Sequence, residues 1–261
     1  EGTKVSSISK TNLNTLSVVV PEIDEQEKIG SLFKKISALI EKQEDKVSNM
    51  EDLKKSMLQK TFPKKGELVP EFRFKGFDGK WIKIKLEKIL KIPDKVPIII
   101  EDYKNIISVR LHTKGAVRNL NSNLSLGSTN YYKRFHGQLI YGKQNIFNGA
   151  IALIDEKFDG MASSADIPSL DIVDSDGQFI ITYMSRPIFY KNTEKMSIGT
   201  GSKRLHEKDL LNMVVIVPKS IEEQEKIGKF FKTLDTQIET EKKLLDSYKM
   251  MKKSLLQKMF V

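Results

Sequence analysis

A segment of the chain occurs twice, once near each end. Residues 25–62 align without a gap with residues 223–260, and 17 of the 38 aligned positions are identical. The similarity continues upstream, where Val18–Pro21 matches Val215–Pro218. Helical arrays repeat their unit back to back, whereas a long unrelated sequence separates these two copies. The repeat therefore predicts two matched elements with one globular insert between them.

Each copy is expected to begin with a short strand and continue as a long helix. The β-branched runs Leu16–Val20 and Met213–Val217 are both followed by proline, which favours a strand that stops there. Acidic residues then open the helical segment and lysines close it, as the helix dipole favours. Within each segment two rows of residues repeat at intervals of seven for more than four heptads, which is typical of a coiled-coil seam.

The expected seam carries a polar residue at its centre in both copies. Gln43 and Glu241 are equivalent, and a polar seam residue commonly fixes the register of a helix pair. We therefore expect an antiparallel pair in which these two residues meet; ordinary amphipathic helices on separate cores are the alternative. The seam residues are Ile29, Phe33, Ile36, Ile40, Gln43, Val47, Met50, Ile227, Phe231, Leu234, Ile238, Glu241, Leu245 and Tyr248.

The insert is predicted to be a mixed module of short strands, loops and a few helices. Short apolar runs such as Gln138–Tyr141 and Ala150–Ile154 alternate with Gly, Asn and Asp, and only Gln178–Met184 and its flank have a helical pattern. The fold class is therefore α+β, with one mixed α/β module and two long helices that form an antiparallel coiled coil.

Composition excludes several classes of protein. The chain has no Cys, which excludes disulfide scaffolds, thiolate zinc sites, iron–sulfur clusters and cysteine nucleophiles. No apolar stretch approaches 18 residues, so no membrane span is expected. The N-terminus resembles no signal peptide, and we expect a cytoplasmic protein. The net charge of +10 is a weak indication of a nucleic-acid partner.

Basic charge is concentrated in one part of the insert. No acidic residue occurs between Tyr103 and Ile154, although seven Lys and Arg and several Tyr, Asn and Gln do. Such side chains bind phosphates and base edges of DNA, whereas a solvated basic face with buried tyrosines is the alternative. The candidate DNA contacts, which include two cations after the Gly199–Ser202 loop, are Arg110, Lys114, Tyr131, Lys133, Arg134, Lys143, Gln144, Asn145, Lys203 and Arg204.

Motifs for catalysis are missing from the sequence. The three histidines have no metal-ligand spacing, and neither a P-loop nor a nucleophile elbow is present. We predict no catalytic residues, no metal site and no cofactor. Seven acids between Asp155 and Asp176 leave one enzymatic alternative, a Mg²⁺-dependent nuclease. A coiled-coil scaffold that binds only protein is the other alternative.

The repeated motif resembles a known family. Pro21, Glu25-Gln26, Ile29 and Leu58–Phe62, followed by the Pro70–Trp81 segment, are similar to type I restriction–modification specificity subunits. Pro218, Glu223-Gln224, Ile227 and Leu256–Phe260 repeat the pattern. The resemblance implies target recognition domains that each read one half of a bipartite DNA site, held apart by two conserved helices.

The resemblance also implies partners and domain boundaries. Modification subunits would dock on the coiled-coil spacer and carry the methyltransferase chemistry, and a restriction subunit would join through them; a half-type subunit would self-associate. Only one recognition domain is complete. The expected boundaries are a remnant of a first recognition domain (1–21), spacer helix 1 (22–62), a linker (63–70), the target recognition domain (71–217) and spacer helix 2 (218–261).

Overall fold

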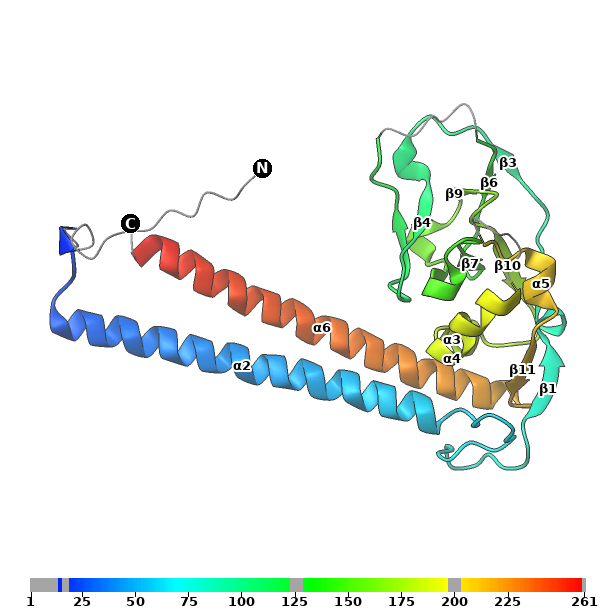
Figure 1. Cartoon of the computed structure of the whole chain (residues 1–261), viewed down its shortest axis with the longest axis horizontal. Coiled ribbons are helices and arrows are strands. Elements are labelled where there is room, and N and C mark those ends of the chain that lie inside the picture. The colour runs from blue at the N-terminus through cyan, green and yellow to red at the C-terminus, as the bar shows by residue number, and fades with distance from the viewer. Residues whose placement is uncertain (1–13, 16–18, 123–128, 197–202, 260–261) are drawn as a thin grey trace. The chain divides into compact units, whose positions relative to one another are not determined.

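The structure is a computed structural model that describes residues 14–15, 19–122, 129–196 and 203–259. It divides into two compact units: one comprises residues 50–238, and the other comprises residues 1–49 together with 239–261. Two long helices, α2 (Ile23–Lys60) and α6 (Ile221–Met259), contribute to both units, and the remaining regular elements lie between them in the sequence (Figure 1). The predicted α+β fold class is confirmed.

The two central polar residues of the repeat meet, as the sequence predicts. In the unit formed by residues 1–49 and 239–261, Gln43 Nε2 donates hydrogen bonds to Glu241 Oε2 (2.6 Å) and to the Glu241 carbonyl oxygen (3.1 Å). Lys46 Nζ lies 2.7 Å from Glu241 Oε1. The hydrogen bonds from Lys46 and Gln43 lower the pKa of Glu241 below its usual value.

The order of contacts along the two helices shows that they are antiparallel. In the same unit Lys252 donates to Ser37 Oγ at 2.9 Å, and Lys249 pairs with Glu44 at 2.6 Å, so positions rise on one helix as they fall on the other. The same order is found in the unit of residues 50–238, where Lys54 pairs with Asp235. Residue 54 is equivalent to residue 252 in the repeat, and residue 37 is equivalent to residue 235. The Lys252–Ser37 and Lys54–Asp235 contacts therefore join the same two positions of the repeat, with the roles of the two helices exchanged.

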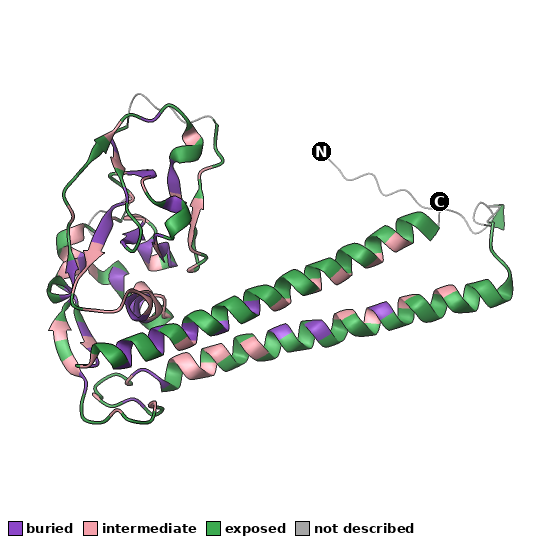
Figure 2. Cartoon of the chain, turned by 180° about the vertical axis from the view of Figure 1, so that it is seen from behind, coloured by how far each residue is buried: buried purple, intermediate pink, exposed green. Residues whose placement is uncertain are grey.

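Every predicted seam residue is buried or half-buried (Figure 2). The second copy nevertheless differs from a simple coiled coil. Ile227, Phe231 and Leu234 belong to the main hydrophobic core of the residue 50–238 unit, together with Phe62. The first turns of α6 therefore complete the core of the module as well as continuing the heptad pattern, because a module packs on them.

The module is built from short antiparallel strands and short helices. The strands are β1 (Ile82–Lys85), β2 (Leu90–Lys91), β3 (Pro97–Ile98), β4 (Ile107–Val109), β5 (Ala116–Arg118), β6 (Tyr131–Lys133), β7 (Leu139–Tyr141), β8 (Ile151–Leu153), β9 (Ala162–Ser164), β10 (Ser169–Ile172) and β11 (Val214–Val217). The α-helices are α3 (Gly177–Met184), α4 (Pro187–Tyr190) and α5 (Glu207–Leu211). The 3₁₀ turns are η1 (Leu86–Lys88), η2 (Tyr103–Asn105), η4 (Ile146–Asn148), η5 (Glu156–Phe158) and η6 (Lys191–Met196).

The strands form four small antiparallel sheets, whose orders are β1-β11, β2-β10-β7-β8, β3-β6-β9 and β4-β5. Strands β7, β8 and β11 and helix α3 lie where the sequence predicts strands and a helix. The predicted strand Leu16–Val20 cannot be compared in full, because residues 16–18 lie outside the described residues; Val19 and Val20 are in no regular element.

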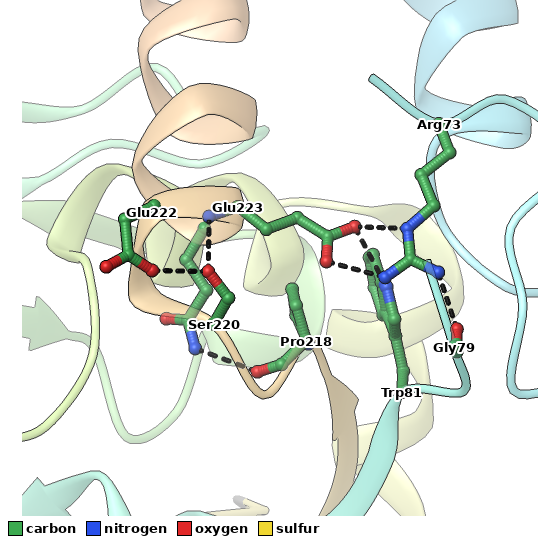
Figure 3. Close-up of polar contacts among 8 residues, drawn as sticks. Arg73, Gly79, Trp81, Pro218, Ser220, Glu222 and Glu223 are labelled. Carbon is green, nitrogen blue, oxygen red and sulfur yellow. Dashed lines mark hydrogen bonds and ion pairs between the residues drawn. The ribbon is translucent and has the colours of Figure 1, made fainter. Parts of the chain in front are cut away.

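The pairing of β1 with β11 brings the two ends of the module together at the start of α6. Trp81 precedes β1 and is 1% exposed, and Glu223 in the first turn of α6 is 2% exposed. Arg73 Nε and Nη2 donate to the two carboxylate oxygens of Glu223 at 2.8 and 2.7 Å, and Trp81 Nε1 donates to Oε1 at 3.2 Å (Figure 3). The buried carboxylate is thus fully paired, as burial of a charge requires.

The next residues of α6 also contact the module closely. Gln224 Oε1 accepts hydrogen bonds from Ser175 Oγ (2.6 Å) and from the Asp176 backbone N–H (3.1 Å). Gly228 lies against the beginning of α3, where an added Cβ would come within 2.4 Å of Asp176 Oδ1 and 2.6 Å of the Phe179 nitrogen. Only glycine fits at this position, because any side chain would collide with the backbone of α3.

We expect Glu223→Ala to lower the free energy of unfolding by about 3–5 kcal/mol, because it leaves the Arg73 guanidinium and the Trp81 N–H without their buried partner. The exposed neighbour Glu225 provides the control, and Glu225→Ala should change stability by less than about 0.5 kcal/mol. Urea unfolding followed by tryptophan fluorescence measures both. Similar small losses for the two variants would show that the Glu223 contact does not hold the module on α6.

Candidate nucleic-acid interface

The hairpin formed by β4 and β5 presents the basic residues of the acid-free stretch. Ile107 pairs with Arg118 and Val109 with Ala116, so residues 110–115 form the tip of the hairpin. Arg110, Lys114 and Arg118 are all exposed. None of the three forms an ion pair with a carboxylate in the described part of the chain. Three cations therefore remain available on one exposed hairpin.

The hairpin tip rests on the turn that joins β7 to β8. The backbone N–H groups of His112 and Thr113 donate to the carbonyl oxygens of Asn148 and Gly149, both at 2.8 Å. Asn145, a predicted contact, begins this turn and is exposed. The structure thus brings Arg110, Lys114 and Asn145 into one region of the module.

Four other predicted contacts are exposed or half-exposed. Three of them have polar partners within the chain, and the fourth, Lys133, lies on β6 and not on the hairpin. Lys133, at the end of β6, is exposed and has no ion-pair partner among the described carboxylates. Lys203 pairs with Glu194 at 2.8 Å, and Arg204 pairs with Asp166 at 3.2 Å. When the Gln144 amide is oriented with its oxygen toward Arg204, that oxygen accepts hydrogen bonds at 2.7 and 3.1 Å.

Lys143 is largely buried, with its side chain 12% exposed, and its ammonium lies 3.1 Å from Glu207. Its backbone carbonyl accepts a hydrogen bond from Leu205, which places residues 143–144 beside Arg204. A lysine held by a carboxylate in this way has little charge to offer to a phosphate. The Gly199–Ser202 loop, which precedes the predicted contacts Lys203 and Arg204, lies outside the described residues.

Two predicted contacts are corrected by the structure, because both side chains are buried. Arg134 is 5% exposed, and its guanidinium donates to Ser163 Oγ (2.7 Å), Ser169 Oγ (3.3 Å) and the carbonyl oxygen of Ile167 (3.3 Å). Burial lowers the pKa of Arg134 to about 10. Tyr131 is 7% exposed and packs in a small core cluster. Both residues hold strands together and do not present a surface to DNA.

A hollow of about 480 Å³ with a mixed apolar and polar lining lies beside the hairpin. Its polar lining includes Ser108 in β4, Asn119 after β5, Asn130 before β6, Ser164 at the end of β9 and the carboxylate residue Asp166. Amide and hydroxyl groups of this kind can donate to or accept from sugars, phosphates and base edges. The hollow adds hydrogen-bonding groups next to the exposed cations.

The acids proposed for a nuclease have separate structural roles. Asp159 accepts a hydrogen bond from the His136 backbone N–H, Asp171 accepts one from Gln138, and Asp176 caps α3 through the Phe179 N–H. Asp166 pairs with Arg204. Among the described residues no group of three or more His, Asp or Glu is placed to hold a metal ion. These contacts do not favour the nuclease alternative.

Sequence reasoning gave no role to the residues that shape the hairpin tip. His112 and Thr113 adopt left-handed backbone conformations, with φ of 58° and 55°. Gly149, with φ of 76°, closes the turn beneath them. No local sequence signal marks two consecutive non-glycine residues in this conformation, although glycine after Asn148 is typical of a turn.

Comparison with known proteins identifies the family. The model of the type I restriction modification DNA specificity domain matches residues 46–249, which is more than three quarters of the chain. The chain belongs to this family. No match is found among curated protein sequences.

Solved structures of this class share the fold. The HsdS subunit from Thermoanaerobacter tengcongensis has a TM-score of 0.55 at 15% identity, and the type I restriction–modification S subunit from M. genitalium has 0.59 at 16%. A third structure, which concerns complex assembly and conformational transition of the type I R-M system, has 0.56 at 15%. They cover 100%, 92% and 92% of this chain, respectively, which in turn spans 64%, 61% and 60% of theirs. Within the described residues, no helix combines the length and apolarity needed to cross a membrane.

Proposed function

We propose that this chain is a non-catalytic DNA-recognition part of a type I restriction–modification system, in which residues 71–217 read one half of a bipartite target. The observation that carries this proposal is the exposed hairpin with Arg110, Lys114 and Arg118 free of ion pairs to described carboxylates. Unpaired cations on an exposed hairpin attract phosphates, and the hollow beside them supplies amide and hydroxyl groups. Membership of the DNA specificity family supports the same conclusion.

The start of α2 supports the proposal that a second module reads the other half of the site. Gln26 Nε2 donates to the Pro21 carbonyl oxygen at 2.7 Å, as Gln224 Nε2 does to Pro218 at 3.2 Å, so the two copies have the same local structure. Glu223, Gln224 and Gly228 are buried against the module, whereas the equivalent residues Glu25, Gln26 and Gly30 are exposed. Nothing lies within 4 Å of a Cβ added at Gly30.

Gly30 weakens helix α2, and no neighbouring group in the structure requires a glycine there. Glycine in the interior of a helix is about 1 kcal/mol less favourable than alanine. At Gly228 the absence of a side chain allows α3 to approach. Gly30 would allow a helix of another module to approach α2 in the same way. We propose that a second recognition module with an Arg and a Trp like Arg73 and Trp81 covers this end of α2.

The module of a second, unchanged copy of the chain does not fit this role. Its Arg73 and Trp81 already hold its own Glu223, and releasing them would leave a buried carboxylate without partners. Self-association through this end would therefore require two copies to exchange helices. A module that precedes α2 in the same polypeptide meets no such cost.

We also propose that modification subunits dock on one side of the helix pair. In the unit of residues 1–49 and 239–261, Leu32 and Leu39 are 39% and 51% exposed, and Leu244 and Met251 are 40% and 53% exposed. Leu39 and Leu244 each directly precede a seam residue, and such rows of an antiparallel pair lie on the same side. The polar contacts of Ser37 with Lys252 and of Glu44 with Lys249 come from the opposite side of the seam. An exposed apolar stripe is suited to amphipathic helices of a partner.

The DNA-binding role predicts a specific change in salt dependence. Replacing Arg110, Lys114 and Arg118 by alanine should reduce the slope of log K against log salt concentration by about 0.9 for each phosphate that the variant no longer neutralises. The control removes the same charge from the same module through alanine at Lys80, Lys83 and Lys88, which are also exposed. Fluorescence anisotropy with duplex DNA at several salt concentrations measures both. Equal effects of the two triple variants would contradict a hairpin-centred interface, and absence of salt-dependent binding would favour a protein-only scaffold.

The bipartite role predicts the behaviour of a chain with two modules. If a second copy of residues 71–217 replaces residues 1–20, the DNA motif selected from random duplexes should become two copies of the single-module motif at one fixed spacing. Gly30→Leu in that chain should broaden the spacing, because leucine blocks the approach of the added module to α2. The exposed neighbour change Ser31→Leu is the control. A fixed spacing that survives Gly30→Leu would contradict docking at this end of α2.

Docking of modification subunits predicts that Leu39→Asp together with Met251→Asp prevents co-purification with the modification subunit of the same system. DNA binding by the chain alone should change by less than about twofold, because both residues are far in sequence from the hairpin. The matched control is Lys42→Asp with Lys253→Asp on exposed polar positions of the same helices. Retention of the modification subunit by the Leu39 and Met251 variant would place its binding surface elsewhere.

A further inference from the structure

The tip of the β4–β5 hairpin is held in a strained conformation. His112 and Thr113 are consecutive residues with φ of 58° and 55°, and Thr113 is β-branched. Each non-glycine residue in this region costs about 1–3 kcal/mol, and such residues persist only where the surroundings hold them. The strain is confined to an exposed segment that contributes no side chain to the main core. Folding of the module therefore gives no reason for it.

The surroundings that hold the tip are the turn of residues 145–149. The Gly149 carbonyl accepts the Thr113 N–H, and the Asn148 carbonyl accepts that of His112. A Cβ at Gly149 would lie 3.1 Å from the Thr113 nitrogen, 3.2 Å from Thr113 Cγ2 and 3.3 Å from His112 Cα. The strained tip therefore lies directly on the face of Gly149 that has no side chain.

The turn is itself rigidly attached to the module. Ile146 is completely buried in the main core, between β7 and β8. The Asn145 carbonyl accepts hydrogen bonds from Asn148 (2.9 Å) and Ala150 (3.0 Å), which close the turn. The position of the hairpin tip is thus determined by the packed interior of the module, although the tip is exposed.

The side chains presented at this fixed position suit the edges of base pairs. Arg110 can donate two hydrogen bonds to guanine, and the exposed Leu111 offers an apolar contact to a thymine methyl. His112 and Lys114 are exposed on either side of Thr113. A two-stranded ribbon has the width that the major groove of B-DNA admits.

We infer that residues 110–114 are the segment that reads DNA sequence in the major groove, and that Gly149 is a positioning residue that fixes this segment. The inference rests on the proposed DNA-recognition function and assigns it to one segment. The strain at residues 112 and 113 is retained because it presents residues 110–114 in one orientation. Gly149 acts only through the backbone of the tip and contacts no DNA.

Glycines elsewhere in the module allow a matched test. Gly160 also has positive φ, of 72°, but nothing lies within 4 Å of a Cβ added there. Gly149→Ala and Gly160→Ala therefore introduce the same kind of backbone strain, and only the first displaces the hairpin tip. The motif bound by the full chain is first selected from random duplexes. Affinities for that motif and for an unrelated duplex are then measured at one salt concentration.

We expect Gly149→Ala to reduce the ratio of specific to non-specific affinity by tenfold or more, a factor on the order of that for removing a single base contact, with non-specific affinity within about twofold of the original. Gly160→Ala should leave the ratio unchanged at a similar loss of thermal stability. A ratio that survives Gly149→Ala, or one that falls equally in both variants, would overturn the inference while leaving DNA binding intact.

A second variant keeps the test decisive if Gly149→Ala does not fold. Arg110→Ala changes an exposed side chain and should alter the selected motif at one position, whereas Lys104→Ala, exposed outside the hairpin, should leave the motif unchanged. An unchanged motif for Arg110→Ala would also overturn the inference. Absence of any selected motif or salt-dependent binding in the original chain would instead defeat the proposed function itself.

Discussion

The buried carboxylate of Glu223 is the contact on which the residue 50–238 unit depends. A charge this far from water is tolerated only when its oxygens are paired, and Arg73 and Trp81 supply those partners. Because Arg73 and Trp81 precede β1 and Glu223 follows β11, the contact closes the module at the point where its two ends meet. The same turn of α6 then completes the core through Ile227 and Phe231. The module and the start of α6 are consequently one folded body.

The repeat uses the same residues in two different environments. At the second copy the Glu-Gln pair and Gly228 are covered by the module, and at the first copy Glu25, Gln26 and Gly30 are exposed. The hydrogen bond from Gln26 to Pro21 shows that this end keeps its local structure when uncovered. The repeated segment thus occurs once buried against the module and once exposed.

Charge alone did not identify the exposed basic residues, because neighbours in the sequence differ in burial. Lys133 is exposed, whereas Arg134 is directed inward to two serine hydroxyls and a backbone carbonyl. Lys133 is the last residue of β6 and Arg134 follows the strand, so their different burial reflects the tertiary contacts that each side chain makes. Lys143 likewise became the partner of Glu207, 64 positions away. A basic stretch of sequence therefore does not by itself show which of its side chains are exposed, because exposure depends on contacts formed in the folded module.

The sequence by itself determined the two helices, their antiparallel pairing, the meeting of Gln43 with Glu241 and the strand β11 before α6, because heptad spacing and β-branched runs are local signals. Only the tertiary structure decided that Arg134 and Tyr131 are interior, that Ile227 and Phe231 serve the module core, and that His112 and Thr113 are strained above Gly149. These outcomes depend on contacts between residues distant in sequence, which no local pattern encodes. The sequence thus determined the long helices and their pairing, whereas long-range packing determined which side chains of the module are exposed.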